Sequence, residues 1–283
     1  MTNRSLVQHY PGIKAFDGAG VKLTRILGSP QIDMLDPFLL LDCFESDEPN
    51  DYLGGFPTHP HRGFETVTYL LNGRMKHKDS VGNEGVIEAG GVQWMTAGKG
   101  ILHSEMPEQE EGLLKGFQLW VNLPASAKMI EPAYQEYSPE TTPIERHENG
   151  TEIRVIAGET NQGTFGPVVN HYTSPTYMDI RLPAHADFEQ KLPMDHNAFL
   201  YVIEGDVNLS DAQGDTRTLN TRQLGVLTKG DQVSLKSGND GAQFLLIAGQ
   251  PLNEPVARGG PFVMNTKAEI LQAFNDFNRG DFS

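Results

Sequence analysis

The chain has 283 residues, which is enough for one large core or for two domains of ordinary size. Its formal charge of −15, from 22 basic and 37 acidic residues, disfavours direct binding to nucleic acid or to an anionic membrane. Cys43 is the only cysteine, so an intrachain disulfide is excluded. No apolar run approaches the roughly 18 residues of a spanning helix, and the opening MTNRSLVQHY lacks the apolar stretch of a secretory signal. We therefore expect a cytoplasmic protein.

Short segments rich in β-branched and aromatic residues, separated by turn signals, fill the N-terminal half. Residues 64–71 form such a segment and end at Asn72-Gly73, a strong hairpin signal. Residues 84–95 predict two short strands around a Gly-Gly turn, and residues 116–123 predict another strand. Many short strands joined by turns favour an all-β barrel or jelly roll.

Two pairs of potential metal ligands occur in this strand-rich half. His59 and His61 are two residues apart, and so are His103 and Glu105. Side chains alternate between the faces of a β-strand, so each pair points to one side. If the two strands are neighbours, three imidazoles and a carboxylate surround one point. That set suits a divalent transition metal such as iron, manganese, nickel, copper or zinc, and leaves room for water, oxygen or substrate.

The chain also carries a diverged internal repeat. Residues 69–73 (YLLNG) resemble residues 201–205 (YVIEG), at an offset of 132 residues that also aligns several later glycines and apolar positions. At this offset the four candidate ligands fall on Lys191, Pro193, Leu235 and Ser237. We therefore expect a metal-binding domain over residues 1–135 and a second domain over 136–283 that has lost the ligands.

Only the last segment has the pattern of a helix. Asn265 or Thr266 can cap its N-terminus, Glu269 lies in the first turn and Gly280 ends it. An apolar stripe is predicted to pack on the outside of a barrel; it consists of Ile270, Leu271, Phe274 and Phe277.

The motifs resemble those of a known family. The elements HPHRGFETVTYL and GKGILHSEMP lie within residues 58–107 and are specific when they occur together. Arg25, residues 36–38 (DPF) and residues 260–265 (GPFVMN) fit the same pattern. The chain is similar to the pirin family, two-domain members of the cupin superfamily. The resemblance implies two jelly-roll β-barrels in one chain with a C-terminal helix, and we expect a monomer.

The resemblance also implies a site and an activity. Its metal, most commonly Fe(II), would be held by His59, His61, His103 and Glu105, with manganese, nickel, copper and zinc as alternatives. Several pirins resemble quercetin 2,3-dioxygenases, which open the central ring of a flavonol with O2 and release CO. Others are discussed as transcription co-regulators. The alternative function is therefore a metal-gated, redox-sensing protein that binds a protein partner without turnover.

Glu65 competes with Glu105 for the role of carboxylate ligand. Counting by two from His61, Glu65 faces the same way if the strand is unbroken, and alternation alone cannot choose between the two carboxylates. Gly63 could host a bulge that breaks the count. The pirin resemblance favours Glu105, with Glu65 as a group that orients a ligand.

Glu105 is also the candidate base for a substrate hydroxyl, because a ligand carboxylate can accept a proton. Phe56, Phe64 and Trp94 lie near the ligands in sequence and are candidates for an apolar pocket wall, although each is more often a core residue. Trp120 is expected in the core. The other histidines, such as His77, are expected to be surface or hydrogen-bonded residues.

Overall fold

The computed structural model describes residues 2–211 and 213–282 and divides the chain into two compact units. The first unit joins Ile13–Glu140 to the C-terminal segment that starts at Leu252. The second unit joins Thr141–Pro251 to the N-terminal segment that ends at Gly12. The division thus differs from the predicted contiguous halves, because each terminal segment belongs to the unit of the other half. Strand pairing explains the N-terminal exchange, since β1 (Leu6–Pro11) pairs with β19 (Gln223–Leu227) of the second unit.

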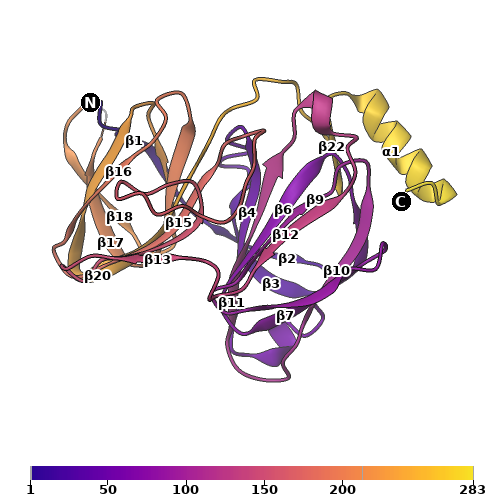
Figure 1. Cartoon of the computed structure of the whole chain (residues 1–283), viewed down its shortest axis with the longest axis horizontal. Helices are drawn as coiled ribbons and strands as arrows, with labels where there is room; N and C mark the ends of the chain where they lie inside the picture. Colours follow the sequence, from indigo (N-terminus) through magenta and orange to yellow (C-terminus); the bar gives the residue numbers. More distant parts are fainter. Residues whose placement is uncertain (1, 212, 283) are drawn as a thin grey trace. The chain divides into compact units, whose positions relative to one another are not determined.

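The first unit contains two main antiparallel sheets and a short ribbon (Figure 1). The larger sheet has the order β12-β9-β6-β11-β4-β3-β2, and its strands are β2 (Ile13–Asp17), β3 (Val21–Leu27), β4 (Phe38–Ser46), β6 (Phe64–Asn72), β9 (Val92–Thr96), β11 (Leu114–Asn122) and β12 (Ala133–Tyr137). The smaller sheet has the order β5-β10-β7-β8, and its strands are β5 (Phe56–His61), β7 (Arg74–Asp79), β8 (Glu84–Glu88) and β10 (Ile101–Pro107). The ribbon pairs β21 (Ala257–Gly259) with β22 (Phe262–Met264).

The second unit is built around one nine-stranded antiparallel sheet. Besides β1 and β19 it contains β13 (Ile144–Arg146), β14 (Glu152–Ala157), β15 (Thr176–Leu182), β16 (Asp187–Lys191), β17 (Asn197–Ser210), β18 (Thr216–Asn220) and β20 (Gln232–Gly249). Leu235, the repeat counterpart of His103, is buried in the apolar core of this unit. Among the described residues, the cluster of metal-ligating side chains lies in the first unit, as the repeat predicts.

The C-terminal helix, α1 (Lys267–Arg279), confirms the predicted all-β architecture with one helix at its end. Thr266 and Glu269 form a capping box, and Gly280 ends the helix in the left-handed conformation with φ of 76°. The predicted apolar stripe is only partly packed, because Leu271 is 63% exposed. Two other residues of the stripe, Ile270 and Phe277, pack against a cluster that includes Phe262 of β22. In Figure 1, α1 lies beside β22.

The helix is also tied to the segment that follows His61. Arg62 is buried and forms an ion pair with Asp276 of α1, with 2.7 Å between Nη1 and the carboxylate oxygen. The Arg62 guanidinium carbon also lies 4.4 Å from the ring centroid of Phe282, a cation–π distance. The chain terminus therefore helps to fix the end of β5.

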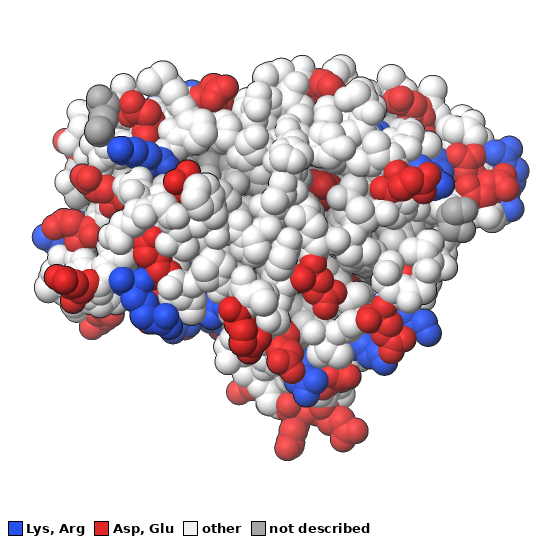
Figure 2. Space-filling view, in the orientation of Figure 1, with Lys and Arg blue, Asp and Glu red and all other residues white. Residues whose placement is uncertain are grey.

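No helix among the described residues has the length and apolar composition needed to cross a membrane. Figure 2 shows acidic side chains spread over the visible face with basic ones between them. On that face the negative charge of the chain is dispersed over the surface.

Lys128 is a buried cation that joins three segments of the first unit. Its Nζ donates hydrogen bonds to the carbonyl of Gly63 at 2.8 Å, to Asn122 Oδ1 at 2.8 Å and to the carbonyl of Val263 at 3.1 Å. Burial lowers the pKa of Lys128 to about 8. The side chain thereby connects the turn after β5, the end of β11 and the ribbon strand β22.

We predict that Lys128→Met lowers the free energy of unfolding of the first unit by about 3 kcal/mol, because three buried oxygen acceptors lose their donor. Urea denaturation followed by tryptophan fluorescence measures this, since both tryptophans, Trp94 and Trp120, lie in that unit. Lys99→Met is the matched control; Lys99 pairs with exposed Glu131, and its removal should change stability by less than about 1 kcal/mol. Equal effects of the two substitutions would contradict a bracing role for Lys128.

Candidate metal centre and its pocket

The two predicted ligand pairs lie on neighbouring strands. β5 and β10 run antiparallel, with His59 opposite His103 and His61 opposite Ile101. The ring nitrogens of His59, His61 and His103 that could bind a cation all lie within 4.8 Å of one another. The Nε2 atoms of His59 and His61 are 3.0 Å apart. Three imidazoles therefore converge on one point, as the alternation of β-strand side chains predicts.

Glu105 lies on the same strand as His103 but outside this 4.8 Å group. Its carboxylate is buried, and accepts hydrogen bonds from Thr68 Oγ1 at 2.6 Å and from Gln118 Nε2 at 3.1 Å. Thr68 and Gln118 belong to the larger sheet, so the two sheets meet at this carboxylate. Glu105 lines the same pocket as His59 and His61.

Glu65 points away from the histidine cluster. β5 ends at His61 and β6 begins at Phe64, so the strand is interrupted and the count by two from His61 fails. Gly63 makes the break with a φ of +86°, and a Cβ atom there would lie 2.0 Å from the Val263 carbonyl oxygen. Phe64 and Thr68 contact the site, which places Glu65 on the opposite face of β6, where it accepts a hydrogen bond from Thr96.

Two histidines of the cluster, His61 and His103, are held in their neutral form. Burial, with the nearby His59, lowers the pKa of His61 to about 3. Burial, with His61 and His59, lowers the pKa of His103 well below its usual value. Neutral imidazoles have lone pairs available for a metal.

The hydrogen bonds of the cluster also fit a cation. His59 Nδ1 donates to the Pro57 carbonyl at 2.9 Å, and His61 Nδ1 lies 3.4 Å from the Pro261 carbonyl, which leaves each Nε2 for a ligand. Both ring nitrogens of His103 are buried and have no hydrogen-bond partner among the described residues. Such orphaned polar atoms are costly unless a further group binds them. The donor set therefore suits a divalent transition metal.

A pocket of about 640 Å³ in the first unit reaches the cluster. Its wall includes Phe56 and Trp120, and exposed Asp17 also lines it, so the pocket is accessible to solvent. Trp120, expected in the core, is therefore a pocket residue. Phe64 lies behind the wall, with its ring centroid 5.0 Å from His61 and 4.4 Å from Trp120. Trp94 is buried and does not line the pocket.

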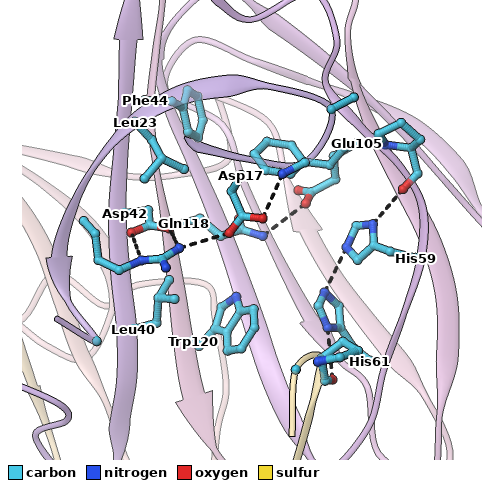
Figure 3. Close-up of a pocket in the computed structure, with 18 of the residues that line it drawn as sticks. Asp17, Leu23, Leu40, Asp42, Phe44, His59, His61, Glu105, Gln118 and Trp120 are labelled. Carbon is cyan, nitrogen blue, oxygen red and sulfur yellow. Dashed lines mark hydrogen bonds and ion pairs between the residues drawn. The ribbon is translucent and has the colours of Figure 1, made fainter. Parts of the chain in front are cut away.

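The pocket also contains a charged group that no ligand motif in the sequence indicates. Figure 3 shows Asp42 and Asp17 in the same pocket as His59, His61 and Glu105. Arg25 joins them, with Nε and Nη2 donating to Asp42 at 3.0 and 2.8 Å, and Nη2 to Asp17 at 3.0 Å. Burial raises the pKa of Asp42 to about 6, against the hydrogen bonds from Arg25. In the sequence, Arg25 stands out only through the resemblance to the pirin family.

His77 is buried beside the site without joining the cluster. It lies on β7 opposite Glu105, its Nε2 is 2.7 Å from a Glu136 carboxylate oxygen, and its ring stacks on Tyr134. His77 is therefore a buried residue paired with Glu136, where a surface or hydrogen-bonded histidine was expected.

We predict that the metal-free protein loses stability as pH falls from 7 to 5. The folded-state pKa of His61, about 3, lies below the roughly 6.5 of an unfolded histidine, so the unfolded chain binds the extra proton in this range. His61 alone should lower the free energy of unfolding by about 2 kcal/mol between pH 7 and pH 5. Urea titrations at both pH values, in the presence of a chelator, measure it.

The pH dependence should be weaker in His61→Asn and unchanged in His171→Asn, which removes an exposed histidine of the second unit. An equal dependence in the wild type and in His61→Asn would contradict this assignment.

Comparison with known proteins places the chain in a family. The family model described as Pirin matches residues 20–121, and the model of the Pirin C-terminal cupin domain matches residues 177–283. The two matched segments correspond to the two strand-rich repeats, so the predicted pair of cupin domains is confirmed.

Individual relatives match over nearly the whole chain. A pirin-like protein of Caulobacter vibrioides is 51% identical and covers 100% of both chains. A protein of Pseudomonas aeruginosa, named provisionally as a quercetin 2,3-dioxygenase, is 47% identical over 98% of this chain and 97% of its own. The crystal structure of a quercetin 2,3-dioxygenase from Acinetobacter baumannii matches with a TM-score of 0.89 at 36% identity, covering 99% of both chains. With its matched domains and its full-length relatives, this chain belongs to the pirin family.

Proposed function

We propose that the protein is a metal-dependent dioxygenase that opens the central ring of flavonols such as quercetin with O2 and releases CO. The observation that carries this proposal is the convergence of three imidazoles on one point, two of which, those of His59 and His61, line a solvent-accessible pocket with aromatic residues in its wall. The names of the similar proteins support the same activity. We propose Fe(II) as the metal, with manganese, nickel, copper and zinc to be compared.

The chain's own residues would hold and prepare the substrate. His59, His61 and His103 would hold the metal, which when bound supplies Lewis-acid and redox chemistry. Glu105 would complete the ligand set and accept the proton of the substrate hydroxyl on a carboxylate oxygen. Thr68 and Gln118 fix that carboxylate from the opposite sheet.

The pocket wall would orient a planar substrate. Trp120 and Phe56 offer aromatic surface, and Phe64 supports both Trp120 and His61 from behind. Stacking against such walls excludes water from the reacting ring. A flavonol, which is planar and aromatic throughout, suits this wall.

The alternative is a metal-gated protein that binds a partner without turnover. A purely structural or sensing metal is expected in a closed, saturated site, whereas a catalytic metal keeps an open position. The pocket that leads to His59 and His61 therefore favours catalysis.

The proposal is tested by measuring O2 uptake and CO release with quercetin. Protein would be loaded anaerobically with one equivalent of ferrous iron and, separately, with each other metal, and free metal would serve as the background. Metal-dependent turnover above that background would support the dioxygenase. Its absence with every metal, in protein shown to hold one equivalent, would favour the partner-binding alternative.

We predict that Glu105→Gln lowers turnover by at least about 100-fold, the usual contribution of a general base. The amide keeps the size of the side chain but cannot accept the proton. The metal affinity should fall by no more than about tenfold because the three histidines remain. Elemental analysis should therefore still find the metal in the variant. Unchanged turnover would refute the base role.

We predict that His103→Asn abolishes metal retention after dialysis, because only two of the three imidazoles whose nitrogens lie within 4.8 Å of one another would remain. Elemental analysis of the dialysed protein gives the result. Full metal content in His103→Asn would show that the ion is bound elsewhere, while His171→Asn should retain one equivalent as the control.

A further inference from the structure

A row of polar side chains crosses the pocket from Glu105 to the charged group. Gln118 of β11 donates a hydrogen bond to Glu105. Gln118 lies opposite Asp42 of the neighbouring strand β4. Asp42 in turn lies opposite Arg25 of the next strand, β3. Neighbouring strands are about 4.8 Å apart, so the Cα of Arg25 lies roughly 10 Å from that of Gln118. The row therefore separates the histidine cluster from a second polar position in the same pocket.

The Asp17–Arg25 pair at this position has unused hydrogen-bonding capacity. Arg25 donates through Nε and Nη2 to its two aspartates, and its Nη1 has no partner within residues 2–211 and 213–282. Asp17 accepts one hydrogen bond from Arg25 and one from the amide of Gly18 at 2.8 Å, and a carboxylate can accept about four. Donors and acceptors thus stand side by side on the pocket wall, where Asp17 is 54% exposed.

The charges at the Asp17–Arg25 end of the pocket favour a neutral ligand group. Arg25 donates to both Asp17 and Asp42, so each charge at this end already has an opposite charge beside it. A carboxylate would meet two aspartates there, and an ammonium group would compete with Arg25 for the same oxygens. A hydroxyl group, which both donates and accepts, matches a carboxylate beside a guanidinium.

We propose that Asp17 and Arg25 form a subsite for phenolic hydroxyl groups on the ring of a neutral aromatic substrate that lies away from the metal. This inference rests on the proposed function, which places the reacting ring at the histidines. The metal end then selects the flavonol core, and the Asp17–Arg25 end selects hydroxylation of the pendant ring. Adjacent hydroxyls fit best, because one can donate to Asp17 while the other accepts from Arg25.

Binding of two flavonols tests the subsite without turnover. Quercetin carries two adjacent hydroxyls on its pendant ring, and galangin carries none there. Isothermal titration calorimetry under anaerobic conditions, on protein loaded with one equivalent of ferrous iron, gives both dissociation constants. The wild type should bind quercetin about tenfold more tightly, the ratio expected for one hydrogen bond to a charged and partly solvated group.

Asp17→Asn should bring the ratio of the two dissociation constants close to one, because the amide replaces a carboxylate oxygen with a donor. Asp33→Asn is the matched control: Asp33 lies 3.7 Å from Arg258, is 86% exposed and does not line the pocket. It removes the same charge and should leave the ratio unchanged.

The outcomes separate the two proposals. A wild-type ratio near one, or a ratio that persists in Asp17→Asn, would overturn the subsite while flavonol binding itself stands. If neither flavonol binds, the proposed function fails and the subsite fails with it. A ratio that falls equally in Asp33→Asn would assign the effect to overall charge and would also overturn the subsite.

Discussion

The antiparallel pairing of β5 with β10 is the constraint on which the site depends. Its register sets His59 opposite His103, and the two-residue period then brings His61 to the same side. A slip by one residue would turn the side chains of one strand to the other face and disperse the cluster. The register is held at the end of β5, where Gly63 makes the turn, Lys128 binds the Gly63 carbonyl and Arg62 pairs with Asp276.

The common direction of each ligand pair could be predicted from sequence because it depends on local alternation alone, whereas the meeting of the two pairs depends on the pairing of β5 with β10. The i, i+2 spacing of His59 and His61 predicts that both side chains lie on the same face of their strand, and the same holds for His103 and Glu105. The choice between Glu65 and Glu105 could not be made that way. It depends on the interruption at Arg62-Gly63, which resets the alternation between β5 and β6. The sequence shows the glycine there but not its φ of +86°.

The charged end of the pocket could not be predicted from residue spacing, for a different reason. Asp17, Arg25 and Asp42 lie on three strands, and none of them has a histidine or carboxylate two residues away in sequence. They meet because β2, β3 and β4 are consecutive in the larger sheet, a fact of sheet order that spacing does not encode. Trp120 was missed similarly, since a tryptophan on an apolar strand suggests core until its face of the sheet is known. The exchange of the terminal segments also depends on long-range pairing, that of β1 with β19.

A contrast between the repeats explains why one unit carries the site. In the second unit, the counterpart of His103 is Leu235, which is part of a continuous apolar core. In the first unit, the corresponding interior holds three imidazoles and a carboxylate, groups that stabilise a fold poorly when they are buried. The first unit also holds buried polar contacts at the edge of that interior, namely the three hydrogen bonds of Lys128 and the Arg62–Asp276 pair. Both end on the turn that follows His61, so they oppose the loosening that a polar interior would otherwise cause. The candidate metal site and the contacts that keep its strands in register are therefore found in the same unit, while the other unit keeps the apolar interior of the shared fold.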